Sequence, residues 1–260
     1  MGHYALSPEQ MKTLDASAIA QGLPALVLME RAALSMLHGL QQYLTEHATE
    51  HALWLQDRCI AIFCGTGNNG GDGLALARLL QSQPWKDRTT VRVYLVGDPQ
   101  RCSPENQQQQ KILAAMGTQL TALTESADLA QIPPLTGHDI CIDALMGVGL
   151  NRPLEGFLAA LLTQLNQGPA LRVALDIPSG IHGATGAVMG TAFQADLTLS
   201  CAQWKWGQLC DPALKYVGTV QVADIGIPDV WLRAHEEKQS APFVKVLSPD
   251  TCRAFVLPHL

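Results

Sequence analysis

Hydrophobic positions along the chain gather into short, nearly unbroken runs such as "CIAIF" (59–63), "VRVYLV" (91–96) and "LRVALDI" (171–177). These runs lack the polar alternation of a half-exposed strand, so they predict strands that are buried on both faces of a mostly parallel sheet. The expected strands lie near 59–64, 91–96, 118–122, 139–143, 171–176, 196–201 and 218–224.

Segments with apolar residues at helical spacing lie between these strands and predict helices at 71–82, 104–116, 125–131 and 154–166. Two more helices are expected before the first strand. Ser7, Pro8 and Gln10 form a helix-start signature with a capping box, and Leu23–Leu44 carries a broad apolar face. Alternation of strands and helices at this spacing predicts an α/β fold, doubly wound and three-layered.

Composition and charge narrow the class of protein. The chain has 260 residues, of which 47% are hydrophobic and 15% charged, as in ordinary soluble domains with a sizeable core. The net charge of −6 argues against a general nucleic-acid or anionic-membrane surface. No apolar run reaches about 18 residues and the start lacks a signal-peptide pattern, so we expect no membrane span and a cytoplasmic location.

The seven cysteines include no C-x-x-C pair, so a zinc site is not expected. Cys59, Cys64, Cys141 and Cys201 lie in or beside expected strands. We interpret them as small buried hydrophobic residues in a reducing compartment.

The loop "CGTGNNGGDG" (64–73) follows the first of these strands. Its glycines allow close approach of a ligand and present N–H groups at a helix start, which suits an anion. Asn68 and Asn69 add carboxamides. Asp72, expected in the first turn of the helix, would repel a pyrophosphate but suit ribose hydroxyls or a cation; its alternative role is to complement the helix dipole.

Other polar residues follow later strands, where ligands bind in open α/β sheets. Asp143 and Asp176 end two strands, Ser179 follows the second, and Lys205 lies in "QWKWGQ" after another. Two carboxylates in one cleft allow acid–base work, and an oxygen-rich set suits a hard cation. The structural alternatives are a helix cap or turn for each aspartate and a solvated surface position for Lys205.

Four motifs resemble, in their order, those of the NAD(P)H-hydrate epimerases. They are "GTGNNGGDGLALARLL", "DALMGVGLNRPLEG", "DIPSGIHGATG" and "AQWKWGQL". The resemblance extends from Ser7 to Asp224. The chain is also similar to the amino-terminal half of the bifunctional bacterial repair enzyme, in which a nucleotide-dependent dehydratase domain follows. The resemblance implies a Rossmann-like α/β/α sandwich and a potassium ion.

The resemblance also implies roles for particular residues. Potassium would be held by Asn69, Asp143 and Ser179, and Asp143 is also the candidate acid–base residue. Val148 departs from the Gly-Thr-Gly common in the family, which puts a side-chain role there in doubt. Substrate-binding positions would be Asn68, Asn69, Gly70, Gly71, Asp72, Gly147, Val148, Gly149, Leu150, Asn151, Arg152, Pro153, Asp176 and Lys205.

The implied activity is interconversion of the R and S forms of hydrated NADH and NADPH at the C6 hemiaminal carbon by proton transfer. One alternative is an NAD(P)-dependent oxidoreductase, although the sequence shows no separate substrate domain. Another is a non-catalytic scaffold that binds a nucleotide or a protein, although Asp72, Asp143 and Asp176 are all retained.

The expected domain organisation is an epimerase domain at 1–228, followed at 229–260 by a final element and a linker that leads to an absent dehydratase domain. Within the second part, "FVKVL" (243–247) could pair with a neighbouring element. The expected partner is a small-molecule substrate, without nucleic acid or membrane, and we expect the chain to form a homo-oligomer.

Overall fold

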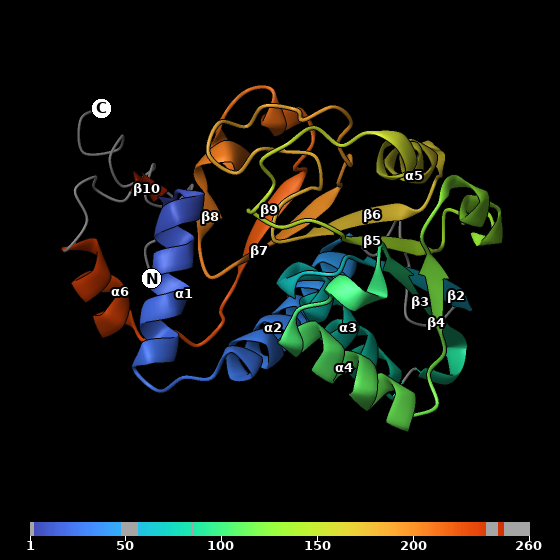
Figure 1. The fold of residues 1–260 in the computed structure, drawn as a ribbon, viewed down its shortest axis with the longest axis horizontal. Coiled ribbons are helices and arrows are strands. Elements are labelled where there is room, and N and C mark those ends of the chain that lie inside the picture. Colours follow the sequence, from blue (N-terminus) through green and yellow to red (C-terminus); the bar gives the residue numbers. More distant parts are fainter. Residues whose placement is uncertain (1–2, 48–56, 85, 238–243, 247–260) are drawn as a thin grey trace.

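The computed structural model describes residues 3–47, 57–84, 86–237 and 244–246, and its centre is a seven-stranded sheet (Figure 1). The strand order is β4-β3-β2-β5-β6-β7-β9, and every neighbouring pair is parallel. The strands are β2 (Arg58–Cys64), β3 (Thr89–Val96), β4 (Leu120–Leu123), β5 (Ile140–Ala144), β6 (Leu171–Leu175), β7 (Leu197–Cys201) and β9 (Thr219–Ala223). All seven predicted strands are therefore confirmed.

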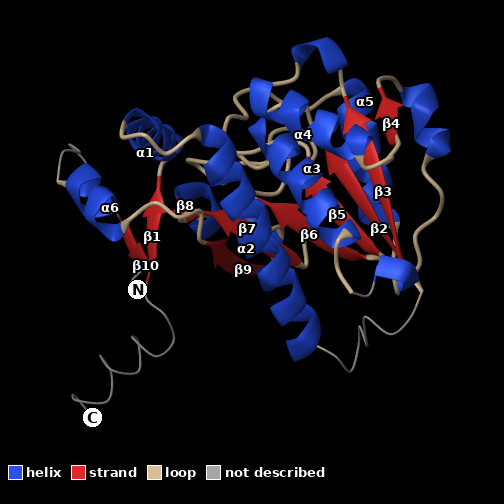
Figure 2. Ribbon diagram, turned by 90° about the horizontal axis from the view of Figure 1, so that it is seen from below, coloured by secondary structure: helices blue, strands red, loops and turns tan. Residues whose placement is uncertain are grey.

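Helices cover both faces of this sheet (Figures 1 and 2). On one face, α2 (Ala25–Glu46) and α3 (Asn68–Gln81) pack against Ile60 and Ile62 of β2, and α4 (Pro104–Ala115) packs against α3. The intervening residues of β2 pack on the other face, where α5 (Gly156–Gln167) lies. The strands are buried on both sides, and the predicted Rossmann-like three-layer α/β fold is confirmed.

A smaller sheet of three strands, in the order β10-β1-β8, lies beside the main sheet. It consists of β1 (His3–Leu6), β8 (Trp204–Lys205) and β10 (Val244–Val246). The helices α1 (Pro8–Ala20) and α6 (Asp229–Glu236) pack beside it through Leu6, Met11, Leu14 and Leu232. These strands are two to four residues long, too short for periodicity to reveal them.

The antiparallel pairing of β10 with β1 confirms that part of 243–247 joins a neighbouring element. Residues 243 and 247 themselves lie outside the described residues. The division of the chain at residue 228 stays a prediction, while α6 and β10 both pack onto elements from the start of the chain.

The starts of α1 and α4 agree with the sequence, whereas the start of α3 differs. Gln10 N donates to Ser7 Oγ and Ser7 N donates to Gln10 Oε1, which confirms the capping box of α1. The expected place of Asp72 is wrong: α3 begins at Asn68, three residues earlier than expected, so Asp72 lies in its second turn. Because Gly71 N donates to Gly67 O, the Asn-Asn-Gly-Gly segment is already helical.

The segment expected as a helix at 125–131 is a 3₁₀ helix, η3 (Ser126–Gln131), while α4 starts at the predicted Ser103 cap. The other short 3₁₀ helices are η1 (Lys86–Arg88), η2 (Pro99–Arg101), η4 (Trp206–Leu209) and η5 (Ala213–Lys215). The two apolar N-terminal helices are both present.

The six described cysteines are free thiols, and two of those in strands, Cys64 and Cys141, are buried as predicted. Cys59 and Cys201 are half-buried. In the described part of the chain, no single helix is long and apolar enough to cross a membrane. The pair α1 and α2 together meets that length and composition, but the two helices are bent by 120°.

Candidate functional site

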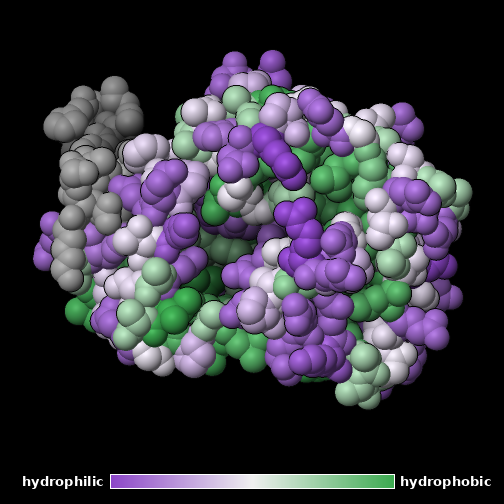
Figure 3. All heavy atoms as spheres, in the orientation of Figure 1, coloured by the Kyte–Doolittle hydropathy of each residue, from purple (hydrophilic) through white to green (hydrophobic). Residues whose placement is uncertain are grey.

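A cleft of about 760 Å³ opens at the carboxyl ends of β2, β5, β6 and β7. The loops after β2 and β5 form its centre, at the point where the strand order reverses, which is where doubly wound folds bind ligands. Residues of α1 complete its wall. Figure 3 shows a hollow between the part of the surface that carries α1 and the main body.

The glycine-rich loop after β2 is held from behind by α4. Asn106 Nδ2 donates to Gly65 O at 2.9 Å and to Gly67 O at 3.0 Å, and Ser103 N donates to Thr66 O at 2.9 Å. Three successive carbonyl groups therefore face α4. Since N–H and C=O are opposed in a trans peptide, the N–H groups that follow them point away from α4. The loop presents donors, as the sequence predicted.

The turn is also sterically tight. A Cβ atom at Gly70 would lie 1.8 Å from Gly65 O, so no other residue fits there without moving the backbone. Gly70 and Gly71 thus lie within α3 behind the cleft wall and do not line it.

Asn69 lies in this wall with only 8% of its surface exposed. Neither its Oδ1 nor its Nδ2 has a hydrogen-bond partner among the described residues. Buried amide groups are almost always hydrogen-bonded, so this side chain is set to bind a group that enters the cleft.

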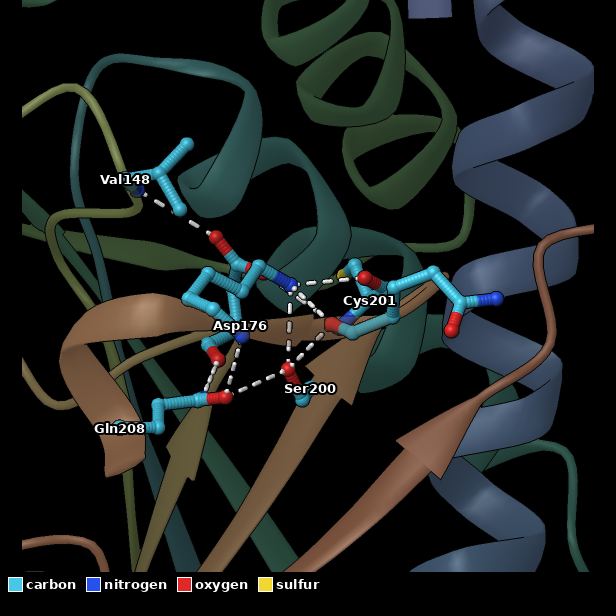
Figure 4. A network of polar contacts seen from close by, with 7 residues as sticks. Val148, Asp176, Ser200, Cys201 and Gln208 are labelled. Atoms are coloured by element: carbon cyan, nitrogen blue, oxygen red, sulfur yellow. Dashed lines mark hydrogen bonds and ion pairs between the residues drawn. The ribbon is translucent and has the colours of Figure 1, made fainter. Parts of the chain in front are cut away.

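Asp176 and Lys205 form a buried ion pair across the ends of β6 and β8 (Figure 4). Lys205 is 1% exposed, and its Nζ also donates to Ser200 Oγ, to Cys201 O at 2.7 Å and to Gln203 O. The alternative of a solvated surface lysine is therefore wrong. Asp176 has a φ of 68°, in the left-handed region that non-glycine residues rarely adopt and that often marks functional sites.

Further hydrogen bonds hold this pair in place. Asp176 accepts from Val148 N and from Cys201 N, both at 3.3 Å. The carboxamide of Gln208 donates to Asp176 O at 2.7 Å and accepts from Lys205 N at 2.9 Å (Figure 4). The backbone on both sides of the pair is thus fixed by one side chain that the sequence motif did not single out.

Asp143, near the end of β5, is fully buried. Its Oδ2 accepts from Ser179 N at 2.7 Å, and its Oδ1 accepts from Ser179 Oγ at 2.7 Å and from Leu145 N at 3.0 Å. Burial raises the pKa of its carboxyl to about 6. No lysine or arginine forms an ion pair with it among the described residues. The carboxyl lies beneath the cleft and does not line it.

Other carboxyl groups do line the cleft, among them those of Asp72 on α3 and Asp15 on α1. Burial raises the pKa of Asp72 well above its usual value. The charges of Asp176 and Asp15 raise this pKa further. Burial likewise raises the pKa of Asp15 to about 6. The charge of Lys205 opposes both shifts.

The cleft thus brings together ten of the predicted substrate-binding residues. Arg152 and Pro153 are exposed and do not line it. Those that line it are Asn68, Asn69, Asp72, Gly147, Val148, Gly149, Leu150, Asn151, Asp176 and Lys205. The residues that sequence reasoning missed are Asp15, Asn106, Gln208 and His182. His182 and Gln208 lie inside two of the quoted motifs, which is a usable signal, whereas Asp15 and Asn106 lie on predicted helices outside those motifs.

Within the described ranges, no three or more His, Cys, Asp or Glu side chains gather in a way that could hold a metal ion. The predicted potassium ligands Asn69, Asp143 and Ser179 are a different, mainly neutral oxygen set, and Ser179 is buried at 1% exposure beside Asp143.

The fold of this chain is similar to that of a yeast protein, ynu0, in its crystal structure. The TM-score is 0.70, with 93% of this chain and 99% of the yeast chain covered. The sequence identity is 17%, so the likeness concerns the fold.

Sequence comparison gives closer relatives. The chain is 42% identical to the NAD(P)H-hydrate epimerase of Levilactobacillus brevis over 206 residues, 79% of this chain and 86% of that protein. It is 32% identical to the bifunctional NAD(P)H-hydrate repair enzyme Nnr of Moorella thermoacetica over 227 residues, 86% of this chain but 41% of that protein. Residues 25–207 match the family described as YjeF-related protein N-terminus. The chain therefore belongs to the YjeF-related N-terminal family, together with the NAD(P)H-hydrate epimerases.

Proposed function

We propose that this protein interconverts the R and S hydrates of NADH and NADPH, and so acts as an isomerase in nicotinamide nucleotide repair. The observation that carries the proposal is a cleft in which carboxyl groups, the Asp176–Lys205 pair and the unpartnered amide of Asn69 surround one space. Family membership supports it, since relatives that match most of this chain are named epimerases.

The reaction needs proton transfer at oxygen and no hydride transfer. The stereocentre carries a hydroxyl on the carbon next to the ring nitrogen. Once that hydroxyl is protonated, the nitrogen lone pair can expel it as water, and the planar iminium can accept water from the other face. Ring opening to an aldehyde is the other route. A positioned acid typically contributes about 10²–10⁴-fold to such a step.

The charge balance of the cleft suits this path. Four carboxyl groups line the cleft, those of Glu9, Asp15, Asp72 and Asp176, whereas its lysines are Lys12 and Lys205. This excess of carboxyl groups stabilises positive charge as it develops on the nicotinamide ring. The N–H groups of the glycine-rich loop provide the complementary environment for the phosphates of the nucleotide.

Potassium is part of the proposal, with Asn69, Asp143 and Ser179 as its ligands. The residues fit a hard cation because, in the described part of the chain, Asn69 Oδ1 is buried without a partner and no cation pairs with the buried Asp143 carboxyl. When bound, potassium would neutralise this carboxyl and hold the three loops together. It is too weakly polarising to act as a strong Lewis acid.

The acid–base role of Asp143 stays a prediction. Its carboxyl is engaged by Ser179 and Leu145 beneath the cleft, an arrangement that supports a role as cation ligand and anchor. Carboxyl groups in the cleft wall are better placed to touch the substrate. We therefore propose that a carboxyl group in the cleft wall transfers the proton.

The activity can be tested by proton NMR. A mixture of R and S hydrates displaced from equilibrium is followed with and without the protein, and faster equilibration is the expected result. An oxidoreductase would instead change the reduced-nicotinamide absorbance when a second substrate is present. A binding scaffold would leave both signals at their spontaneous rates.

Three wider predictions accompany the proposal. The protein would act in the cytoplasm and as a homo-oligomer. In the natural protein, the domain would be fused to a nucleotide-dependent dehydratase, as the match to part of the bifunctional Moorella enzyme suggests. A measurement of the molecular mass of the protein in solution tests whether it forms a homo-oligomer.

A further inference from the structure

Asp15 contributes a carboxyl group to the cleft from outside the segment that carries the family motifs. It lies on α1, which precedes the matched residues 25–207. The other cleft residues of this helix include Met11, which anchors it in the small core beside α6. The helix thus holds Asp15 against loops that arise from the main sheet.

One carboxyl oxygen of Asp15 is held there without a partner among the described residues. This oxygen, Oδ1, is buried and makes no hydrogen bond within the described residues. Asn69 lies on the glycine-rich side of the same cleft and is only 8% exposed. Its Oδ1 and Nδ2 are also buried and make no hydrogen bond within the described residues. Leaving a buried polar atom unpaired is unfavourable, so two such side chains in one cleft indicate a ligand that pairs with them.

The surroundings of Asp15 suit a proton carrier. Burial raises its pKa to about 6, while the charge of Lys205 lowers this pKa and that of Asp176 raises it. Asp176 already holds the Lys205 ammonium in its ion pair. Asp15 has no ion-pair partner among the described residues, so its carboxyl is available to exchange a proton near neutral pH.

We propose that Asp15 is a catalytic residue that contacts the C6 hydroxyl of the hydrate and donates the proton on which its departure depends. This inference rests on the proposed epimerase function. The proton leaves the Asp15 carboxyl for the hydroxyl oxygen, the C6–O bond breaks, and the ring-nitrogen lone pair forms the C=N bond of the iminium. Water then adds to the opposite face and releases its proton to solvent, and the Asp15 carboxylate takes up a proton from solvent. No other reagent is consumed.

The test is the Asp15→Asn variant, which has the same size and can still hydrogen-bond but cannot carry the proton. We expect kcat for epimerisation to fall at least about 100-fold, while KM changes less than about threefold. Asp87→Asn is the matched control. It makes the same change on an exposed residue of η1, at the amino ends of the strands, and should keep wild-type rates.

Two further measurements separate catalysis from structure. Formate added to Asp15→Ala should restore the rate in proportion to its concentration, which a structural role does not predict. The melting temperature of Asp15→Asn should equal or exceed that of the wild type, because the amide cannot ionise in this buried position.

The outcomes are distinct. If the wild type and Asp87→Asn accelerate epimerisation and Asp15→Asn keeps kcat within threefold, or raises KM alone, Asp15 is not the proton donor while the proposed function stands. If the wild type itself gives only the spontaneous rate, the proposed function fails and this inference fails with it.

Discussion

Ser179 donates two hydrogen bonds to the buried carboxyl of Asp143, one from its backbone N–H and one from its hydroxyl, each 2.7 Å long. The pair ties the end of β5 to the loop that follows β6, directly beneath the cleft. Because the hydroxyl also accepts from Met146 N at 2.9 Å, the loop after β5 is held by the same residue. The floor of the site therefore depends on this one contact.

Replacing Asp143 by Asn should both destabilise the protein and remove its activity. An amide offers one acceptor in place of two, so either Ser179 N or Leu145 N is left facing a donor. The expected loss of unfolding free energy is about 1–3 kcal/mol, measured by urea denaturation. Ser179→Ala, which removes only the hydroxyl, should lose less stability. Near-wild-type activity of Asp143→Asn would contradict both roles assigned to this carboxyl.

Potassium should stabilise the folded protein. A cation that binds only the native state at ten times its Kd adds about 1.4 kcal/mol, because binding shifts the folding equilibrium by mass action. Melting curves in potassium chloride should therefore lie above those in lithium or choline chloride. Asn69→Ala should abolish the difference. Identical curves for the wild type in all three salts would exclude a site formed by Asn69, Asp143 and Ser179.

Asn106 should act on substrate affinity through the loop that it holds. Asn106→Leu leaves the carbonyls of Gly65 and Gly67 without their donor, so the loop no longer presents its N–H groups in a fixed direction. We expect KM to rise about tenfold with kcat kept within about threefold, since the lost interactions are with the bound nucleotide. Gln108→Leu, an exposed neighbour on α4, is the control. A fall in kcat at unchanged KM would show that the loop serves another purpose.

Lys205 should matter for stability as much as for activity. Lys205→Met leaves Asp176 in the cleft wall without its cation, and breaking a buried pair from one side typically costs about 3–5 kcal/mol. Adding Asp176→Asn should restore much of the stability without restoring epimerisation. Thermal melts of the two single variants and the double variant measure the coupling. Additive losses would mean that the pair contributes no specific interaction.

The raised pKa of Asp15 predicts a pH dependence of stability. Its usual value is 3.8 and its folded value is about 6, so between these pH values the folded state binds more protons than the unfolded state. Stability due to this group therefore falls as the pH rises from about 4 to about 6, by up to about 3 kcal/mol, and stays constant above. Asp15→Asn lacks this ionisable group. Its unfolding free energy, minus that of the wild type, should therefore increase as the pH rises from about 4 to about 6. A constant difference across pH 4–7 would show that Asp15 is not buried as described.

Local sequence was sufficient to predict the layers of this protein and the place of its site. Strand β2 is an example: an unbroken apolar run is stable only with both faces covered, which requires helices on each side. The polar residues that end β2, β5 and β6 had to meet, because parallel strands bring their carboxyl ends to one edge. Asn69 and Asp176 could therefore be found together from their positions in the chain.

Contacts between distant segments cannot be predicted from the local spacing of hydrophobic residues. These contacts determine the positions of the other site residues. The sequence left Lys205 as either a surface residue or a site residue; its burial results from pairing of β8 with β1, about two hundred positions away along the chain. Asp143 was predicted as the acid–base residue and a potassium ligand, and only the structure shows that the hydrogen bonds from Ser179 hold it beneath the cleft. Asp15 lay on a predicted helix with no sign of its neighbours. Only the packing of that helix beside the sheet brought its carboxyl to the cleft, because side-chain burial is a property of the assembled fold.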